Sequence, residues 1–362
     1  MTPMLATGAY VVSALGTVAA LALRILDADP TLTFVVSAVA ILGLAYTLGH
    51  ATEQLGIAAG PRIGGIMNAT VGNIGEIIIA AFLIIDGKIE VVHASITGSI
   101  VGNLLLVLGA SLLVGGLKNG IQRYDDQITG MNAASLILAT IGLVVPAVFA
   151  FVIGAAGEST APGDRGFDQI EALTIGTAIL LLGTYAAQTF FFLRSDAGPR
   201  VEGEEPETPD WGWRLSLGIL LLSAAALTVT SEILVHSLEP AVASLGWSEF
   251  FVGIIVIPLI GNLAEHIVGV TLAYKNRMDF SLITSIGSAT QIALFAVPVL
   301  VFFGLFVGNP VTLVFSPLEV VAVAVAVFLA GFIALDGRSN WVEGLQLMSV
   351  YAMLALAFFF LS

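Results

Sequence analysis

The stretch VGNIGE at residues 71–76 has a counterpart in IGNLAE at residues 260–265. Around these motifs, residues 71–103 align without a gap to residues 260–292, and the offset stays at 189, the difference between 260 and 71. The alignment pairs Gly72 with Gly261, Asn73 with Asn262, Glu76 with Glu265, Gly98 with Gly287, and Ser99 with Ser288. The chain therefore contains an internal repeat, and each copy carries one acidic residue within an apolar stretch.

The composition predicts an integral membrane protein. Of the 362 residues, 57% are hydrophobic and 10% are charged, whereas soluble domains carry about 25% charged residues. The few charges stand in short clusters between apolar runs near or above the roughly 20 residues that span a bilayer. The first run has no basic residue before Arg24 and is too long for a signal peptide, so we interpret it as a retained span.

Proline, glycine and charged residues divide the chain into eleven predicted transmembrane helices, so we expect an all-α fold. The predicted spans are 5–26, 31–53, 63–85, 89–115, 129–154, 170–193, 213–236, 248–273, 280–307, 312–334 and 341–361. An odd number of spans separates the two repeat copies, so the second copy crosses the lipid bilayer in the opposite direction. Such an inverted repeat usually places a transporter's substrate site at the repeat interface, near the membrane midplane.

The basic residues predict how the chain is oriented. Loops on one side carry three of them, Arg24, Lys88 and Arg165. The other nine are Arg62, Lys118, Arg123, Arg194, Arg200, Arg214, Lys275, Arg277 and Arg338. The positive-inside rule places the side with nine in the cytoplasm. We therefore expect a cytoplasmic N-terminus, a cytoplasmic acidic linker at 195–211 and an outside C-terminus, in the plasma membrane of a prokaryote.

Glu76 and Glu265 fall near the middle of their spans and are the candidate transport residues. A carboxylate at that depth costs roughly 3 kcal/mol on insertion scales, so it requires a counter-charge, a water-filled cavity or a bound proton. No Lys or Arg lies at matching depth in any predicted span. A bound cation or bound protons are therefore the expected compensation.

Neutral oxygen atoms accompany both acids in the sequence. Asn73 and Asn262 each stand three residues before a glutamate, so each pair is expected to share a helix face. Residues that weaken a helix, and so let backbone carbonyls turn toward an ion, are Gly72, Gly75, Pro258 and Gly261. The second helix of each hairpin adds Ser99, Asn103, Ser288, Thr290 and Gln291.

This set of donors is typical of a hard-cation site. Ca²⁺ binds six to eight oxygens in irregular geometry, whereas Mg²⁺ requires a tight octahedron. The carboxylates that neutralise one Ca²⁺ can instead each hold a proton, because a buried carboxyl group is protonated more readily than one in water. Competition for Glu76 and Glu265 would then give exchange without a separate proton path.

His266 follows Glu265 directly, whereas Ile77 stands at this place in the first copy. We interpret His266 as a proton relay or as a residue that tunes Glu265, since ionisable groups at membrane depth are seldom idle. The alternative is a packed histidine bonded to a neighbouring backbone carbonyl.

Several other function classes are disfavoured. The net charge of −14 gives no reason to expect a nucleic-acid partner. The absence of cysteine excludes disulfides, thiolate metal sites and cysteine nucleophiles. We find no His-rich metal motif, nucleophile elbow or Gly-rich phosphate loop, so we expect neither an enzyme nor an organic cofactor.

Both motifs resemble the cation/proton exchanger (CAX) family of the calcium/cation antiporter superfamily. The matching stretches are GGIMNATVGNIGE at 64–76, GSIVGNLLLVLG at 98–109, PLIGNLAEH at 258–266 and GSATQIAL at 287–294. In that family an extra helix precedes two inverted five-helix halves. The implied parts are a helix at 1–27, halves at 28–194 and 212–362, their motifs at 64–109 and 257–298, and the linker at 195–211.

The resemblance implies Ca²⁺ transport driven by protons. Glu76 and Glu265 would be protonated and metal-bound in turn. Residues implied nearby are Asn73, Asn262, Ser99, Ser288, His266 and Gln291. Glu53 and Glu232, which close two predicted spans, would be vestibule acids, although polar helix ends need no function. Gly102 stands where the family often has serine, so it is assigned no ligand.

Three alternatives stay open. Sodium/calcium exchangers of the same superfamily use a Ser-Leu-Pro-Glu type of motif and an extra membrane acid, whereas this chain has Gly-Asn-x-x-Glu twice and Gln291. A passive cation channel would commonly have a rotational rather than an inverted repeat. A membrane enzyme could use the paired acids to hold a catalytic metal. The sequence does not fix the oligomeric state.

Overall fold

The structure, a computed structural model, is almost entirely helical, which confirms the all-α prediction. It describes residues 3–59, 67, 71–124, 126–194 and 209–361. The helices of the first part are α1 (Pro3–Ile25), α2 (Pro30–Ala59), α4 (Ile74–Ile85), α5 (Ile89–Val101), α6 (Leu108–Asn119), α7 (Asp126–Ala155) and α8 (Arg165–Arg194). Those of the second part are α9 (Trp213–Leu245), α10 (Glu249–Phe251), α11 (Ile257–Gly261), α12 (Leu263–Tyr274), α13 (Met278–Gln291), α14 (Val297–Val307), α15 (Pro317–Ala334) and α16 (Trp341–Leu361).

Three of these helices run on through π-helical segments. They are η1 (Gly102–Val107) between α5 and α6, η2 (Val252–Val256) between α10 and α11, and η3 (Ile292–Ala296) between α13 and α14. With the repeat offset of 189, η1 corresponds to residues 291–296, which is almost the range of η3. The internal repeat therefore extends to a local distortion of the helix, of a kind that is frequent at functional sites.

The spans match the predicted ones closely, with four differences, one of which is that the helix expected to end at 53 continues to Ala59. For the predicted span 63–85, the structure describes α4 and a few residues before it; residues 63–66 and 68–70 lie outside the described part. The helix expected from residue 312 begins only at Pro317. The helix expected to end at 236 continues to Leu245 and ends at Gly246, whose φ of 68° suits glycine.

The late start of α15 has a physical cause. The Ser316 side chain accepts a hydrogen bond from the backbone N–H of Glu319, and the Glu319 side chain accepts one from the backbone N–H of Ser316, which forms a capping box. The segment before it bonds to side chains instead: Thr312 O lies 2.7 Å from His93 Nε2, and Leu313 N donates to Thr174 Oγ1. His93 is therefore structural.

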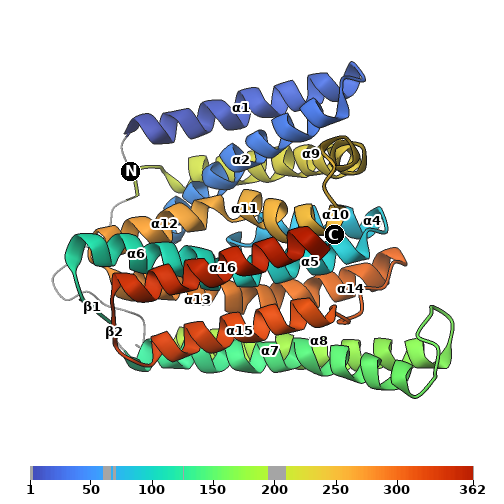
Figure 1. Cartoon of the computed structure of the whole chain (residues 1–362). Coiled ribbons are helices and arrows are strands. Elements are labelled where there is room, and N and C mark those ends of the chain that lie inside the picture. The colour runs from blue at the N-terminus through green and yellow to red at the C-terminus, as the bar shows by residue number, and fades with distance from the viewer. Residues whose placement is uncertain (1–2, 60–66, 68–70, 125, 195–208, 362) are drawn as a thin grey trace. The chain divides into compact units, whose positions relative to one another are not determined.

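The chain forms two compact units, and the first contains residues 1–82, 183–246 and 260–264. In this unit α1 packs along α2, and α2 packs against α9 (Figure 1). Small residues allow the close approach, because a Cβ atom at Gly43 would lie only 2.7 Å from the backbone N of Ser13.

The second unit contains residues 83–182, 247–259 and 265–362. In it α6 packs on α16, α15 packs on α7, and α5 contacts η2 (Figure 1). A Cβ atom at Gly98 would lie 1.9 Å from Ile254 O, so the backbones of α5 and η2 are in direct contact here. A short antiparallel pair, β1 (Gln122–Arg123) with β2 (Arg338–Ser339), joins two loops of this unit.

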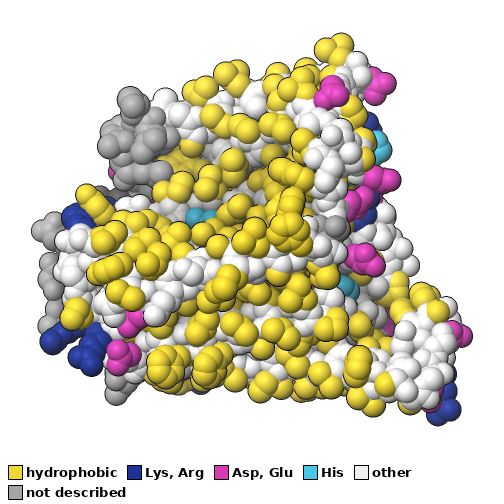
Figure 2. Space-filling model, in the orientation of Figure 1, with side chains coloured by type: hydrophobic (Ala, Val, Ile, Leu, Met, Phe, Trp, Pro, Cys, Tyr) yellow, Lys and Arg dark blue, Asp and Glu magenta, His cyan; other side chains and the backbone are white. Residues whose placement is uncertain are grey.

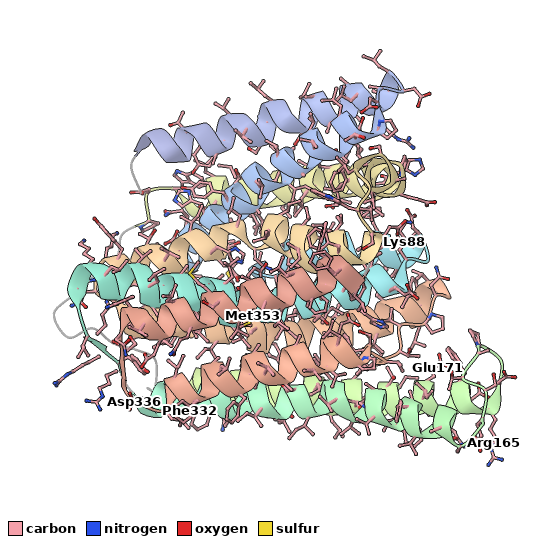
Figure 3. All side chains as sticks on the ribbon, in the orientation of Figure 1. Lys88, Arg165, Glu171, Phe332, Asp336 and Met353 are labelled. Atoms are coloured by element: carbon pink, nitrogen blue, oxygen red, sulfur yellow. The ribbon has the colours of Figure 1, made fainter. Side chains whose placement is uncertain are left out.

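The helices have the length and surface of membrane spans. Within the described residues, nine are long and apolar enough to cross a bilayer, and the pair Glu249–Gly261 and Glu265–Tyr274, bent by 61°, makes a tenth. Hydrophobic side chains cover the visible sides of α15 and α16 (Figure 2). In Figure 3, Asp336 and Arg165 lie at helix ends, whereas Met353 lies part-way along α16. This distribution suits a chain whose flanks face lipid.

Candidate functional site

Both motif glutamates lie in the first turn of a helix that follows a break. Glu76 is in the first turn of α4, directly after a turn at Gly72 and Asn73. Glu265 is in the first turn of α12, after a break at Asn262. The breaks lie beside Gly72 and Gly261, which were expected to weaken the helix, whereas Pro258 lies inside α11. A helix N-terminus carries partial positive charge, so each carboxylate lies where negative charge is stabilised.

In the first compact unit, Glu76 is bonded to the motif of the other repeat copy. Asn262 Nδ2 donates to Glu76 Oε1 over 2.5 Å, and Asn262 is 2% exposed. A Cβ atom at Gly261 would lie 3.2 Å from Glu76 Cγ, so glycine leaves room for the acid. The expectation that Asn262 shares a helix face with Glu265 is wrong, because Asn262 stands in the break before α12 and points to Glu76 instead.

In the second compact unit, Glu265 is the end of a chain of hydrogen bonds. Ser288 Oγ, from α13, donates to Glu265 Oε2. Asn103 Nδ2, from η1, donates to Ser288 Oγ over 3.2 Å. Ser288 and Asn103 are both buried. The structure thus brings two of the predicted neutral residues together in one chain of hydrogen bonds that ends at the acid.

The other predicted neutral residues lie in or beside these same elements. Asn73 and Ser99 are buried, 1% and 2% exposed, while Gly72 is half-buried. Gln291 is half-buried and is the last residue of α13, directly before η3. His266 is half-buried beside Glu265. The roles of these residues in binding remain predictions.

Glu53 and Glu232 do not end their helices. Both are exposed, but α2 continues to Ala59 and α9 to Leu245. Buried residues cause the extension: Gln54, 5% exposed, accepts a hydrogen bond from Asp210 N over 2.7 Å, and a buried stripe on α9 runs on to Val242. The two acids therefore stand on the flanks of long helices in the first compact unit.

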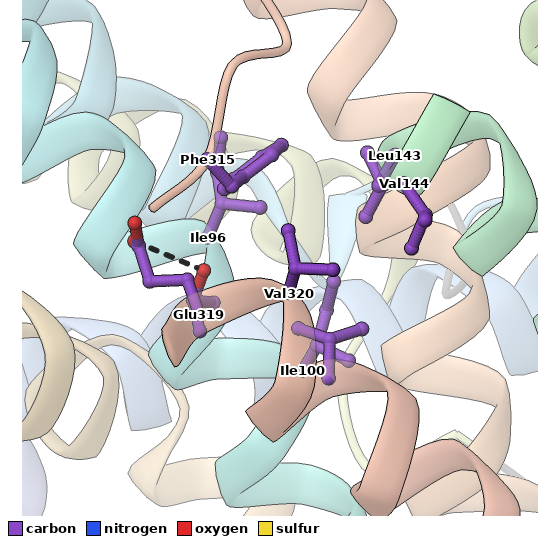
Figure 4. Close-up of a pocket in the computed structure, with 9 residues that line it drawn as sticks. Ile96, Ile100, Leu143, Val144, Phe315, Glu319 and Val320 are labelled. Atoms are coloured by element: carbon purple, nitrogen blue, oxygen red, sulfur yellow. Dashed lines mark hydrogen bonds between the residues drawn. The ribbon is translucent and has the colours of Figure 1, made fainter. Parts of the chain in front are cut away.

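Sequence reasoning missed Glu319, an acid that is buried more fully than Glu76 and Glu265. It is 3% exposed, and Oε1 accepts a hydrogen bond from Thr97 Oγ1 over 3.2 Å beside a small pocket (Figure 4). Its other oxygen belongs to the capping box of α15. The spacing Ser-x-x-Glu at 316–319 was the signal that could have found it. Because these partners account for both oxygens, Glu319 is explained as a structural acid of the second unit.

Comparison with known proteins relates the whole chain to cation exchangers. A family model described as sodium/calcium exchanger protein matches residues 30–194 and 215–360. A Ca²⁺/H⁺ antiporter of Aphanothece halophytica is 40% identical over 351 residues, covering 92% of this chain and 91% of the relative. The Ca²⁺/H⁺ antiporter ChaA of Bacillus subtilis is 39% identical over 334 residues, covering 91% and 92%.

A solved structure has the same fold over nearly the whole chain. That of native YfkE superposes with a TM-score of 0.82 at 34% identity, covering 97% of this chain and 99% of the other. The similarity spans both repeat motifs and nearly the whole length of each protein.

Proposed function

The chain belongs to the sodium/calcium exchanger protein family, and on that premise we propose that it is an antiporter that exchanges Ca²⁺ for protons by alternating access. Two relatives close to 40% identical over more than nine-tenths of the chain are Ca²⁺/H⁺ antiporters. The inverted repeat supports alternating access, because two related halves can expose one site to each side in turn.

Glu76 and Glu265 are the proposed transport residues, and one observation carries this assignment. Each copy of the repeat has one acid in the first turn of a helix, and its carboxylate accepts a hydrogen bond from a neutral side chain. The donor is Asn262 for Glu76 and Ser288 for Glu265. These donors stabilise the ionised carboxylate, and their remaining oxygens suit a hard cation. Asn73, Ser99, Gly72 and Gly261 are proposed to contribute further side-chain or backbone oxygens.

The exchange follows from charge. Two carboxylates in an apolar surrounding must be neutralised, and either one Ca²⁺ or one proton on each achieves this. Ca²⁺ binding therefore expels protons, and protonation on the other side releases Ca²⁺. His266, adjacent to Glu265, is proposed to assist the proton step, and Gln291, Glu53 and Glu232 are proposed to support binding or access. No organic cofactor is needed for this cycle.

The proposed location is the plasma membrane, with a cytoplasmic N-terminus and linker at 195–211 and an outside C-terminus. Lysine and arginine predominate in the loops assigned to the cytoplasm. A transporter with no enzymatic activity is proposed, and Ca²⁺ and H⁺ are its substrates.

Flux measurements with purified protein in liposomes test the coupling ion. We expect Ca²⁺ uptake to follow an imposed pH gradient and to stay unchanged when a Na⁺ gradient is imposed at constant pH. Na⁺-driven uptake at constant pH would instead establish the sodium/calcium exchange after which the family is described. Ca²⁺ leak without either gradient would establish a channel.

Glutamine substitutions test the two acids. Glu76→Gln and Glu265→Gln each remove one charge at similar volume, so we expect either variant to lose proton-driven Ca²⁺ uptake while it still folds. Glu53→Gln and Glu232→Gln are the matched controls, because these acids are exposed, and we expect them only to slow uptake. Near-normal exchange in either of the first two variants would remove both residues from the proposed mechanism.

A further inference from the structure

A line of buried polar groups continues from Glu265 along α12 in the second compact unit. Glu265, Gly269 and Ala273 stand four residues apart and so lie on one face of the helix. The next helix, α13, runs back along α12 and presents Ser288, Ser285 and Ser281 on one of its own faces. Eight residues of α-helix correspond to about 12 Å, so this face reaches from the acid to the end of α12.

The middle of this line lies at Gly269, where α12 has no side chain. A Cβ atom there would lie 3.1 Å from Val107 Cγ1, 3.5 Å from Ser111 Oγ and 3.6 Å from Ser285 Oγ. Glycine therefore lets α12 approach side chains of α6 and α13 closely, and hydroxyl oxygens from both helices lie next to its backbone at this point.

The far end of the line lies at the turn after α12. Gln122 Nε2 donates to Ala273 O and to Asn276 Oδ1, both over 3.0 Å. Asn276 is exposed, whereas Gln122 is 2% exposed. The polar groups thus connect a buried acid to a residue at the surface.

Several polar atoms along the line are buried without a hydrogen-bond partner among the described residues. They are Asn103 Oδ1, Ser111 Oγ, Ser281 Oγ and Gln122 Oε1. Each such atom costs about 1–3 kcal/mol if it stays unsatisfied. Buried polar groups of this kind are ordinarily satisfied by ordered water.

The first repeat copy lacks this line. At the offset of 189, Gly269, Ser281 and Ser285 correspond to Ala80, Val92 and Ile96. The acid and its neighbouring serine are therefore duplicated, but the polar groups beyond them are not. Any function of this line therefore concerns Glu265 and not Glu76.

We propose that a row of water molecules occupies this line and conducts protons between Glu265 and the turn at Lys275–Arg277. We call this line the hydroxyl path. Its polar side chains are those of Asn103, Ser111, Gln122, Ser281 and Ser285, and it passes the backbone at Gly269. The proposal rests on the proposed Ca²⁺/H⁺ exchange. It replaces the expectation that exchange needs no separate proton path, because it adds a proton route that Ca²⁺ does not share. Lys275 and Arg277 belong to the loops expected in the cytoplasm, so the route serves that side.

Serine hydroxyls and water can each accept one proton and donate another. A proton that leaves Glu265 is taken up by the first oxygen, which passes its own proton to the next, so only O–H bonds break and form and no electron moves. Ca²⁺ requires six to eight oxygens around it, whereas two hydroxyl oxygens lie beside Gly269.

Two flux measurements on each variant in liposomes test the path. Gly269→Ala places a methyl group 3.5 Å from Ser111 Oγ and 3.6 Å from Ser285 Oγ, and it requires Val107 Cγ1, at 3.1 Å, to move by a few tenths of an ångström. The double variant Ser281→Ala and Ser285→Ala removes two oxygens. We expect the rate of proton-driven Ca²⁺ uptake to fall about tenfold or more in both variants, because a positioned proton-transfer group raises a reaction rate by at least that factor. Exchange of ⁴⁵Ca²⁺ for unlabelled Ca²⁺, which moves no proton, should keep its wild-type rate.

Ser37→Ala is the matched control, because Ser37 is also a buried serine but lies on α2 in the first unit. An equal loss of both fluxes in Gly269→Ala and in the double variant, or no loss in either, would overturn the path. Wild-type protein without proton-driven uptake would instead refute the proposed function.

Radiolytic labelling with H₂¹⁸O tests the water directly, without transport. Bound water beside Gly269 should label Val107, and Gly269→Ala should abolish that labelling. Unlabelled Val107 in folded wild-type protein would refute the row of water molecules.

Discussion

At the scale of the residue, the asparagine of the second motif bonds the glutamate of the first. The sequence suggests that Asn262 acts with the glutamate three positions later, but its amide donates to Glu76. The break before α12 explains this, because a residue outside the helix does not follow helical spacing. A hydrogen bond between an amide and a buried carboxylate favours the ionised form that binds a cation.

Asn262→Ala should weaken Ca²⁺ binding. A hydrogen bond to a charged group is worth about 1.5–3 kcal/mol, so we expect the Ca²⁺ concentration for half-maximal proton-driven uptake to rise roughly tenfold or more. Asn309→Ala is the control, since Asn309 donates only to the backbone carbonyls of Ile84 and Ile85. An unchanged half-maximal concentration in Asn262→Ala would show that this amide does not support the acid.

At the scale of the element, the two repeat copies have similar helices, but those helices pack differently. Gly98 and Gly287 correspond in sequence, and η1 and η3 begin a few residues after them. A Cβ atom at Gly98 would overlap Ile254 O, whereas one at Gly287 would meet nothing within 4 Å. Only the first of these glycines is required by the contact of α5 with η2.

Gly98→Ala should therefore destabilise the protein, and Gly287→Ala should not. Overpacking of this kind costs about 1–3 kcal/mol, which should lower the midpoint of thermal unfolding in detergent. Gly102→Ala is a second control in the same continuous helix, because its Cβ atom would also lie in open space. Equal midpoints for Gly98→Ala and Gly102→Ala would contradict the close contact.

The elements also show what a sequence can predict. The spans were predictable because a bilayer requires long apolar helices with satisfied backbone groups. The π-helical segments were not, since apolar residues such as Leu104 and Leu105 suit an α-helix equally well. Residues 313–315 are apolar too, and only the side chains of His93 and Thr174 show that the backbone of Thr312 and Leu313 bonds elsewhere. The acids were predictable from the repeat, but their donors Asn262 and Ser288 were assigned to them only by the structure.

At the scale of the whole molecule, the orientation in the membrane can be tested because the chain contains no cysteine. Single cysteines at Lys118 and Arg338 should react with a membrane-impermeant maleimide only after the cytoplasmic side is opened. A cysteine at Arg165 should react in intact cells. All three positions are exposed, so burial would not confuse the result. The opposite pattern of labelling would invert the predicted topology and reassign the hydroxyl path to the outside.

The matching π-helical segments have a consequence for the helices that follow them. A π-helical segment closes hydrogen bonds between residues i and i+5 instead of i and i+4, so the residues after it face a direction that a continuous α-helix would not give them. Both copies carry this change at nearly the same register, in η1 and in η3. Helical spacing counted from α5 or α13 therefore does not carry through into α6 or α14, and the change of direction is common to both halves.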